Sequence, residues 1–391
     1  MPRGGVAFIV HAPGLAEEAL MPVEFVGMIG PAPGRAEGGR VHVIGGGIDP
    51  EFLCRFAQAH EASGFDRALV GYWSTAADGL QVAAAAAACT ERLGFLIAHR
   101  PGFVAPTLAA RAAATLDHFS GGRIALHIIS GGDPKEQRRD GDFLLHDDRY
   151  RRTDEYLSVM RQTWSSDEPF DHQGTYYHFE RAFSDVKPLQ QPSIPIYFGG
   201  SSTAALNVAA KHADVYAMWG EPRAAVAAKI AEVRSAAERH GRRPKFSVSF
   251  RPILAATEEK AWERARRILS SVKRAGPDVE MGESRRPEAT GSKRLLEFAA
   301  MADRHDERLW MPIAAATGAR GNTSALVGTP EQVAEALLAY YDLGVTTLLI
   351  RGFDPLQDAI EFGEELIPTV RAEVAQRDRE ARQSPSGRGG G

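Results

Sequence analysis

The chain alternates short apolar runs with longer segments in which apolar residues recur at helical spacing. Eight of the apolar runs have the length of a strand, and they are apolar over almost their whole length. Such runs are typical of a parallel sheet that is buried on both faces. The predicted strands are residues 23–29, 67–70, 94–98, 123–129, 196–198, a run that ends at Trp219, 246–255 and 346–351.

Helical patterns separate these strands. The first predicted helix carries Phe52, Leu53, Phe56 and Ala57 on one face and ends at Gly64. The predicted helices are residues 49–63, 79–91, 107–119, 147–164, a segment after Ser202, 224–240 and 330–343. Eight strand–helix units favour a closed (β/α)₈ barrel. An open sheet with a nucleotide-binding loop is the alternative, but no GxGxxG motif follows the first strand.

The start of the domain is ambiguous because residues 6–10 and 23–29 both have the pattern of a first strand. The second run is longer and leads through a polar loop to the first helix. We therefore expect residues 1–20 to be an extension and residues 21–381 to be one domain. The glycine-rich residues 382–391 are predicted to be a disordered tail.

Two insertions interrupt the regular alternation. Residues 167–193 have the pattern of a hairpin with a proline-bounded exit. Residues 275–325 are rich in charge and small residues and lack clear periodicity, which predicts a mobile lid or a solvated loop. The end of this stretch, residues 318–328, carries Arg320 and is the candidate lid.

Composition narrows the functional classes. The net charge is −4, so no overall positive field favours nucleic acid or an anionic membrane. No apolar run reaches the ~20 residues that span a bilayer, and no secretion signal is evident, so the cytoplasm is expected. Cys54 and Cys89 are the only cysteines. Both lie in alanine-rich helical patterns, which favours buried free thiols over a disulfide or a metal pair.

The segment from Pro195 to Pro222 carries the clearest chemical signal. Gly199 and Gly200 follow an apolar strand and let the backbone turn tightly. Ser201 and Ser202 can cap the next helix, whose free N–H groups favour a phosphate. The pattern predicts a phosphorylated cofactor at the carboxyl edge of the sheet.

Functional residues of a barrel gather where its strands end. The side chains predicted there are aromatic, hydroxyl-bearing and cationic. They lack the acidic and histidine cluster of a metal hydrolase and the paired carboxylates of a glycosidase. The set would suit a flat, anionic cofactor, and we expect no metal. Its members are Tyr72, Trp73, Ser74, Asp78, His99, Arg100, His127, Ser130, Gly131, Gly199, Gly200, Ser201, Ser202, Trp219, Arg251, Arg351, Phe353 and Asp354.

Four runs together resemble the bacterial luciferase-like flavin monooxygenases. They are ATLDHFSGGRIALHIISGG (114–132), HDDRYRRTDEYL (146–157), PIYFGGSS (195–202) and YAMWGEP (216–222). Within that family the chain most resembles the reduced-flavin-dependent alkanesulfonate monooxygenases, over about residues 23–370. The resemblance implies a (β/α)₈ barrel with a lid and a homodimer or homotetramer. It also implies reduced FMN from a separate NAD(P)H-dependent flavin reductase, O₂, and a small organic substrate such as an organosulfur compound.

The resemblance also implies roles for individual residues. Tyr150, Gly200, Ser201 and Ser202 would hold the phosphate, while His127, Ser130, Tyr72, Ser74 and Trp219 would surround the flavin ring. A barrel-interior histidine is the alternative for His127, and a core aromatic is the alternative for Trp219. The full set of expected cofactor contacts is Tyr72, Ser74, His99, His127, Ser130, Tyr150, Gly199, Gly200, Ser201, Ser202 and Trp219.

The substrate side departs from the alkanesulfonate pattern. Where those enzymes have Arg-x-His on the seventh strand, this chain has Ser249 and Arg251; their Tyr-Pro-His is Phe353-Asp354-Pro355 here. Their cysteine after the second strand is Ala76, and their loop arginine falls on Ala319, beside Arg320. The flavin site therefore matches better than the substrate site.

The expected catalytic residues are Arg251, His127 and Arg320. A guanidinium is always charged and can orient an anionic substrate. His127 could donate to an oxygen or nitrogen of the flavin ring, or titrate near neutral pH. Arg100 and Arg351 are alternatives, and surface ion pairing or a structural role remains open for each arginine. Two other functions stay open: hydride transfer with the deazaflavin F420, and flavin binding without catalysis.

Overall fold

The computed structural model describes residues 23–33, 44, 47–275, 289–319 and 321–383. Eight parallel strands form a ring, in which each strand pairs with its two neighbours. The ring closes because β9 pairs with both β8 and β13. These barrel strands are β1 (Glu24–Ile29), β2 (Arg67–Val70), β3 (Gly94–His99), β4 (Ile124–Ile128), β7 (Ile196–Gly199), β8 (Val215–Trp219), β9 (Lys245–Leu254) and β13 (Thr347–Ile350).

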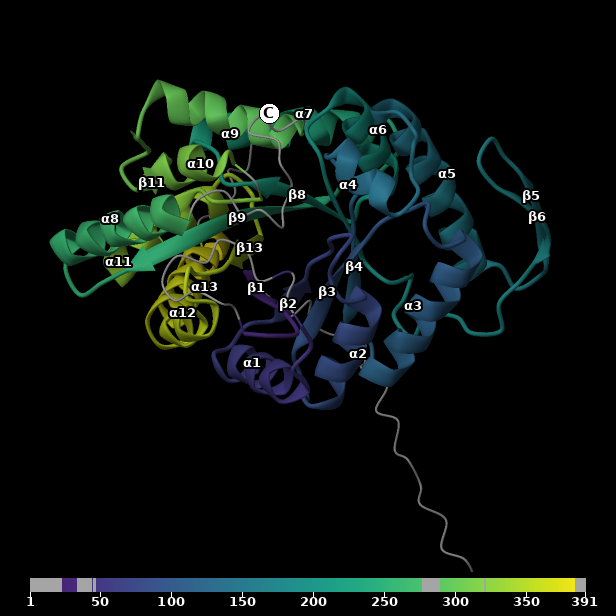
Figure 1. Cartoon of the computed structure of the whole chain (residues 1–391), viewed down its shortest axis with the longest axis horizontal. Coiled ribbons are helices and arrows are strands. Elements are labelled where there is room, and N and C mark those ends of the chain that lie inside the picture. Colours follow the sequence, from purple (N-terminus) through teal and green to yellow (C-terminus); the bar gives the residue numbers. More distant parts are fainter. Residues whose placement is uncertain (1–22, 34–43, 45–46, 276–288, 320, 384–391) are drawn as a thin grey trace, which may run out of the picture.

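Helices lie around the outside of this ring (Figure 1). The (β/α)₈ prediction is confirmed, and the observed strands differ from the predicted ones by no more than one residue at either end. The helices around the ring are α1 (Pro50–Ala62), α2 (Gly79–Ala88), α3 (Pro106–Ser120), α4 (Pro134–Arg139), α5 (His146–Ser165), α6 (Thr203–His212), α7 (Arg223–Glu238), α11 (Pro330–Tyr341), α12 (Pro355–Glu361), the π-helix η2 (Phe362–Leu366) and α13 (Ile367–Gln383).

Side-chain caps determine where several of these helices begin. Asp49 and Asp78 each accept a hydrogen bond from a backbone N–H in the first turn of α1 and α2. Thr329 and Gln332 form a reciprocal capping box at the start of α11. Each cap satisfies an N–H that has no partner within the helix, so the βα turns have a defined geometry at the carboxyl ends of the strands.

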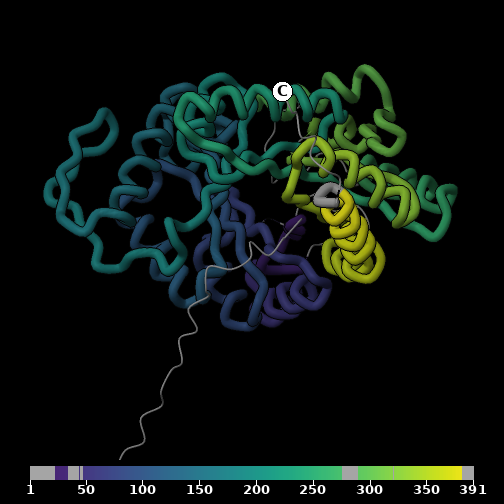
Figure 2. Tube along the Cα trace, turned by 180° about the vertical axis from the view of Figure 1, so that it is seen from behind, coloured from purple at the N-terminus to yellow at the C-terminus, as the bar shows by residue number. Residues whose placement is uncertain are grey.

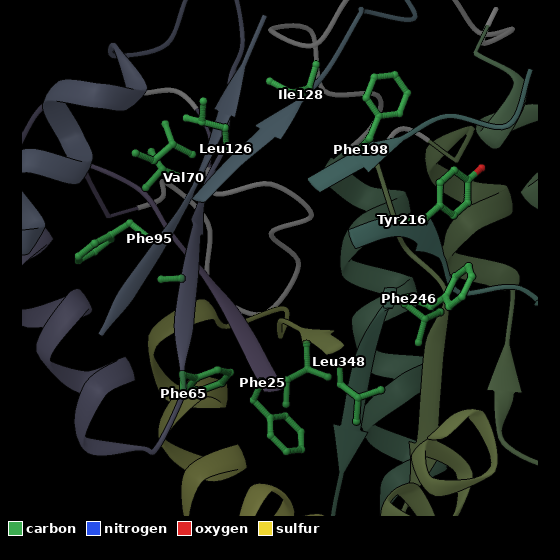
Figure 3. Close-up of a cluster of buried hydrophobic side chains, with 14 of the residues drawn as sticks. Phe25, Phe65, Val70, Phe95, Leu126, Ile128, Phe198, Tyr216, Phe246 and Leu348 are labelled. Carbon is green, nitrogen blue, oxygen red and sulfur yellow. The ribbon is translucent and has the colours of Figure 1, made fainter. Parts of the chain in front are cut away.

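The apolar core has two parts because alternate strand residues face opposite sides. The larger part lies between the ring and its helices and includes Phe25, Phe95, Phe198 and Phe246 (Figure 3). The smaller part fills the barrel interior with residues such as Val26, Leu96, Ala125, Tyr197 and Val215. The barrel is therefore packed through its middle, and only its ends remain for polar groups.

A carboxylate organises the amino end of the barrel. Glu24 accepts hydrogen bonds from Arg67 Nε at 2.7 Å, Tyr197 Oη at 2.6 Å and Thr347 Oγ1 at 3.0 Å. These four side chains come from four different strands of the barrel. They tie the start of the ring together below the apolar interior.

Strand β9 extends beyond the barrel. Its residues 251–254 pair with β12 (Ala325–Gly328), which continues to β11 (Leu309–Trp310) and β10 (Arg304–His305). Helix α8 (Glu258–Ala275) contacts β9 and β12 of this small sheet, and helix α10 (Pro312–Thr317) contacts α8. A third apolar cluster, which includes Trp310 and Ile313, fills the interface.

The structure corrects the expectation for residues 275–325. Their described part forms α9 (Thr290–Met301), α10 and two strands, and Asn322, Thr323 and Ser324 are almost fully buried. The candidate lid at 318–328 is thus a buried connection where it is described. Its polar composition is explained by hydrogen bonding inside the protein instead of solvation. Arg320 itself lies outside the described residues.

The other insertion forms the predicted hairpin, β5 (Phe170–Gln173) and β6 (His178–Ala182). It projects from the edge of the barrel in both views (Figures 1 and 2). Glu155 on α5 anchors the hairpin by accepting hydrogen bonds from the backbone N–H groups of Thr175, Tyr176 and Tyr177.

The prediction of free thiols is wrong. Cys54 on α1 and Cys89 at the end of α2 form a disulfide, with their Cα atoms 5.8 Å apart. Both residues are partly exposed and lie on neighbouring helices. Helical patterns alone do not show which faces of two helices meet, so the pairing was not visible in the sequence.

The described residues contain no group of three or more histidine, cysteine, aspartate or glutamate side chains that could hold a metal ion. Within the same residues, no helix is long and apolar enough to cross a membrane. The run at 6–10, the proposed extension at 1–20 and the tail from 384 onwards lie outside the described residues.

Replacing Glu24 with alanine should lower the free energy of unfolding by about 3 kcal/mol, because it leaves Arg67 and two hydroxyl groups without their acceptor. Urea unfolding followed by circular dichroism would measure the change. Glu335→Ala, on the exposed face of α11, is the matched control and should shift stability by less than about 0.5 kcal/mol. Equal effects of the two variants would contradict the role given to Glu24.

Candidate functional site

The candidate site lies at the carboxyl ends of the barrel strands, with His127 at its centre. His127 on β4 faces the interior beside Gly199 on β7, where an added Cβ would lie 3.6 Å from His127 Cε1. Its Nδ1 is enclosed and has no hydrogen-bond partner in the described part of the chain. Burial lowers the pKa of His127 to about 4, so the ring is neutral near pH 7. A neutral imidazole with a free nitrogen can donate to, or accept from, a bound molecule.

A small cradle lies beside His127 at the start of α6. The Tyr150 hydroxyl of α5 lies next to Ser202, and an added Cβ on Gly200 would be 3.1 Å from that hydroxyl and 2.7 Å from Ala205 Cβ. Gly200 has φ +142°, which also favours glycine. The Tyr216 hydroxyl donates to the Gly200 carbonyl at 2.5 Å and holds the turn in place.

This cradle brings together the residues predicted to bind phosphate. Ser202 caps α6 by accepting from the backbone N–H of Ala205 at 3.2 Å. The neighbouring Ser201 is only partly buried. Hydroxyl groups, a glycine turn and the amino end of a helix form a site suited to an anion.

Loops after β2 and β3 form one wall of the site. Arg100 Nη1 donates to Glu136 Oε2 at 2.5 Å, and both side chains are less than 5% exposed. The backbone N–H of Ser74 donates to the other oxygen of Glu136 at 2.8 Å. The Arg100 guanidinium stacks on the Tyr72 ring, 4.2 Å from its centre. The wall is therefore held rigidly before any ligand binds.

Two polar groups in this wall lack partners. Ser74 Oγ and Trp73 Nε1 are enclosed, and no described residue satisfies them. The Tyr72 hydroxyl donates to Asp140 Oδ2 at 2.6 Å, and burial raises the pKa of Tyr72. Buried polar atoms without partners are uncommon and often mark a place where a ligand completes the hydrogen bonding.

Sequence reasoning missed Glu136, which joins this wall to α4. A usable signal was present, since the DPKEQ segment directly follows the Gly-Gly turn after the fourth strand. A charged residue at that edge of a barrel lies among functional side chains.

Two predicted contacts point towards α5. His99 Nε2 lies 2.7 Å from the Tyr156 hydroxyl, and Ser130 Oγ lies 2.9 Å from Thr153 Oγ1. Burial lowers the pKa of His99 to about 4. Both side chains therefore face residues of α5, whereas His127 lies beside Gly199 of β7.

Arg251 is 1% exposed and deeply embedded. It donates to the carbonyl oxygens of Asn322 at 3.2 Å and Gly352 at 2.8 Å, and its guanidinium lies 4.7 Å from the centre of the Phe353 ring. Burial and the neighbouring Arg351 hold the pKa of Arg251 well below its usual value. This geometry favours a positioning role over contact with substrate.

Arg351 is the more available guanidinium. It donates to the same Asn322 carbonyl at 2.9 Å and contacts Met28 Sδ at 2.9 Å, while its Nε is enclosed without a partner among the described residues. No ion pair joins Arg351 to a carboxylate in the part of the chain that the structure describes. Asn322, which the sequence did not single out, links both arginines to Ser249 through its amide.

The amino end of α9 covers the mouth of the barrel. An added Cβ on Gly291 would lie 3.2 Å from the Trp219 ring, and one on Gly132 would lie 2.8 Å from Ala289. Trp219 ends β8, and Gly132 follows β4. The first turn of α9 thus lies between two strand ends that border the site.

A closed (β/α)₈ barrel with a polar cradle suited to an anion and a neutral histidine nearby defines the site as an anion-binding barrel site. The chain belongs to the luciferase-like monooxygenase family, whose sequence model matches residues 28–347.

Solved structures with the same fold include three informative relatives. Riboflavin lyase with a modified FMN and riboflavin is 20% identical; the match covers 90% of this chain and 92% of the lyase, with a TM-score of 0.72. EDTA monooxygenase from Chelativorans sp. BNC1 is 20% identical; the match covers 90% of this chain and 94% of the monooxygenase, with a TM-score of 0.67. An F420-dependent secondary alcohol dehydrogenase with an F420–acetone adduct is 17% identical; the match covers 90% of this chain and 100% of the dehydrogenase, with a TM-score of 0.64.

Stability should fall as pH falls from about 6.5 to about 4. His60, His99 and His127 have pKa values of about 4 in the folded protein, against 6.5 for an ordinary histidine. The unfolded chain therefore binds more protons in this window, and protonation favours unfolding. His127→Asn should flatten the profile by ~3 kcal/mol between pH 7 and pH 4. Urea unfolding at stepped pH would measure this, and a profile parallel to that of the wild type would contradict it.

Proposed function

We propose that this chain is a two-component monooxygenase that uses reduced FMN and O₂ to oxygenate a small organic substrate. The observation that carries the proposal is the cradle of Tyr150, Gly200 and Ser202 beside the unpaired Nδ1 of His127. The cradle fits the phosphate of a flavin, and the histidine nitrogen fits the polar edge of its ring. The modified FMN in riboflavin lyase and the named activity of EDTA monooxygenase support the same assignment.

The residues present define how the protein would hold the cofactor. The Tyr150 hydroxyl and the N–H groups at the start of α6 would bind the phosphate, with Ser201 and Ser202 beside it. Neutral His127, Ser74 Oγ and Trp73 Nε1 would offer hydrogen bonds to the polar edge of the ring. When bound, reduced FMN would supply the electrons that activate O₂.

The protein's own part in the reaction is positioning, charge and exclusion of water. The Arg100–Glu136 pair holds Tyr72 and Ser74 in place. Arg251 donates to the Asn322 carbonyl, which also accepts a hydrogen bond from Arg351 and fixes the position of that guanidinium. Arg351 Nε, charged and unpaired, would stabilise negative charge on a reacting oxygen or a substrate anion. Trp219 and the first turn of α9 restrict access of water.

An F420-dependent hydride transferase is the second candidate. The observation that favours it is the fold shared with the F420-dependent alcohol dehydrogenase. A phosphate cradle serves either cofactor, so the two candidates share Tyr150, Gly200 and Ser202. A flavin-binding protein without catalysis is a third possibility that uses the same residues.

The finer assignments also belong to this proposal. We infer an organosulfur substrate, such as an alkanesulfonate or a sulfone, from the resemblance of the motifs. A separate NAD(P)H-dependent reductase would supply the reduced flavin. A cytoplasmic homodimer or homotetramer completes the hypothesis.

An anaerobic titration tests the cofactor directly. The purified chain is titrated with reduced FMN and, separately, with reduced F420, and each complex is then mixed with O₂-saturated buffer. Binding of reduced FMN together with rapid O₂ consumption is expected. Binding of reduced F420 alone, with no O₂ consumption, would overturn the proposal in favour of hydride transfer. Binding of FMN without O₂ consumption, in the presence of a panel of organosulfur compounds, would favour the non-catalytic alternative.

Gly200→Ala should weaken FMN binding by at least about tenfold, because its Cβ would occupy the cradle. Tyr150→Phe should also weaken FMN binding, because it removes the hydroxyl that would donate to the phosphate and keeps the ring. Binding of riboflavin, which lacks the phosphate, should change much less in both variants.

Gly241→Ala is the matched control for backbone strain. Gly241 also has positive φ, at +64°, but an added Cβ there meets nothing within 4 Å. Fluorescence titration would measure all of these affinities. If Gly200→Ala lost equal affinity for FMN and for riboflavin, the cradle would not hold the phosphate.

A further inference from the structure

A cavity of about 550 Å³ lies beside the mouth of the barrel, between α9 and the segment from α4 to α5. Its wall includes Arg138 from α4, Arg149 from α5, and Thr290 and Lys293 from the first turn of α9. The Tyr150–Gly200–Ser202 cradle described above does not line it. The cavity therefore needs an explanation of its own.

The charge of Arg149 is only partly offset by described carboxylates. Arg149 is 3% exposed and donates to the carbonyl oxygens of Ser130, Gly131 and Leu144. Asp142 favours its charged form electrostatically but forms its ion pair with Arg152, and burial still lowers the pKa of Arg149. A buried cation that is only partly compensated is costly, and an anion nearby would reduce that cost.

Two further cations stand at the rim. Arg138 and Lys293 are exposed, and neither side chain is paired with another described residue. They approach the cavity from opposite sides, one from α4 and one from α9. The one carboxylate in the lining, Asp142, is already paired with Arg152 at 2.6 Å. The lining as a whole is positive, although the chain has a net charge of −4.

Apolar side chains lie next to these cations. Phe143 is 74% exposed and Leu145 is 75% exposed, and both line the cavity. Large apolar side chains this exposed, on the wall of a cavity, are typical of a surface that contacts a ligand. The lining therefore combines positive charge with apolar contact area.

We propose that this cavity binds a small organic anion, with its carboxylate, phosphate or sulfonate group between Arg138 and Lys293 above Arg149 and its apolar body against Phe143 and Leu145. The anionic group has two possible sources: a substrate, or the terminal phosphate of the cofactor, which would then not occupy the Tyr150–Gly200–Ser202 cradle. The binding site is inferred from the cavity itself and does not depend on the reaction proposed above.

Octanoate and octanamide are the probes, because they share one apolar chain and differ in charge. Isothermal titration of the flavin-free protein should show octanoate binding at one site, and octanamide should bind at least about tenfold more weakly. The double variant Arg138→Gln/Lys293→Gln should bind octanoate about tenfold more weakly than the wild type. Both replaced side chains are exposed, so the variant should keep the melting temperature of the wild type.

Lys135→Gln/Arg139→Gln is the matched control, because it removes two exposed cations from α4 that do not line the cavity. It should bind octanoate like the wild type. Equal octanoate affinity in the wild type and the cavity variant would overturn the proposal. So would equal losses in both variants, equal affinity for octanoate and octanamide, or no octanoate binding by the wild type.

A repeat with FMN-saturated protein separates the two sources of the anion. Unchanged octanoate binding assigns the cavity to a substrate anion, whereas competition by FMN assigns it to the cofactor phosphate. Neither arm needs O₂ or turnover. Failure of the anion site is therefore distinguishable from failure of the proposed oxygenase function.

Discussion

The double use of β9 is the constraint on which the architecture depends. Residues 245–249 pair with β8 and residues 247–250 pair with β13, which closes the barrel; residues 251–254 then pair with β12 outside it. The partner strands β13 and β12 thus diverge at Arg251. Backbone carbonyls near that point have no partner strand to bond to. The Arg251 guanidinium donates to two of them, at Asn322 and Gly352. Because buried carbonyls require donors, an arginine at this position allows one strand to belong to two sheets.

The mouth of the barrel carries an excess of buried positive charge. Arg100, Arg149 and Arg351 come from strand ends or from the helix beside them, and Glu136 is the one described carboxylate that forms an ion pair with any of these three. Carbonyl oxygens satisfy most of the remaining donors. In a chain of net charge −4, this arrangement concentrates positive potential at one end of the barrel. An anionic cofactor or ligand would be attracted to that end and not to the rest of the surface.

Sequence patterns predicted the ring well and the connections poorly, for physical reasons. A strand such as Arg67–Val70 is determined by its own apolar run and its flanking turns, which are local signals. The turn at Gly200 and Ser202 was predictable because glycine and capping residues have local conformational meaning, whereas Tyr150 was expected there only from the resemblance to the family. Asn322 and Ser324 look like loop residues, and their burial arises only because two strands diverge beside them. The direction of the His99 side chain depends on how α5 packs, and the Cys54–Cys89 pairing depends on which faces of α1 and α2 meet. The apolar periodicity of a sequence does not specify either contact.

The first turn of α9 connects the mouth and the neighbouring cavity. Gly291 packs on Trp219 at the mouth, while Thr290 and Lys293 line the cavity. A side chain at position 291 would push the helix away from the tryptophan, so the close approach depends on glycine. The same turn therefore forms a wall of both spaces. A ligand that orders this turn from one side lowers the entropic cost of binding on the other, and by thermodynamic reciprocity the coupling acts equally in both directions.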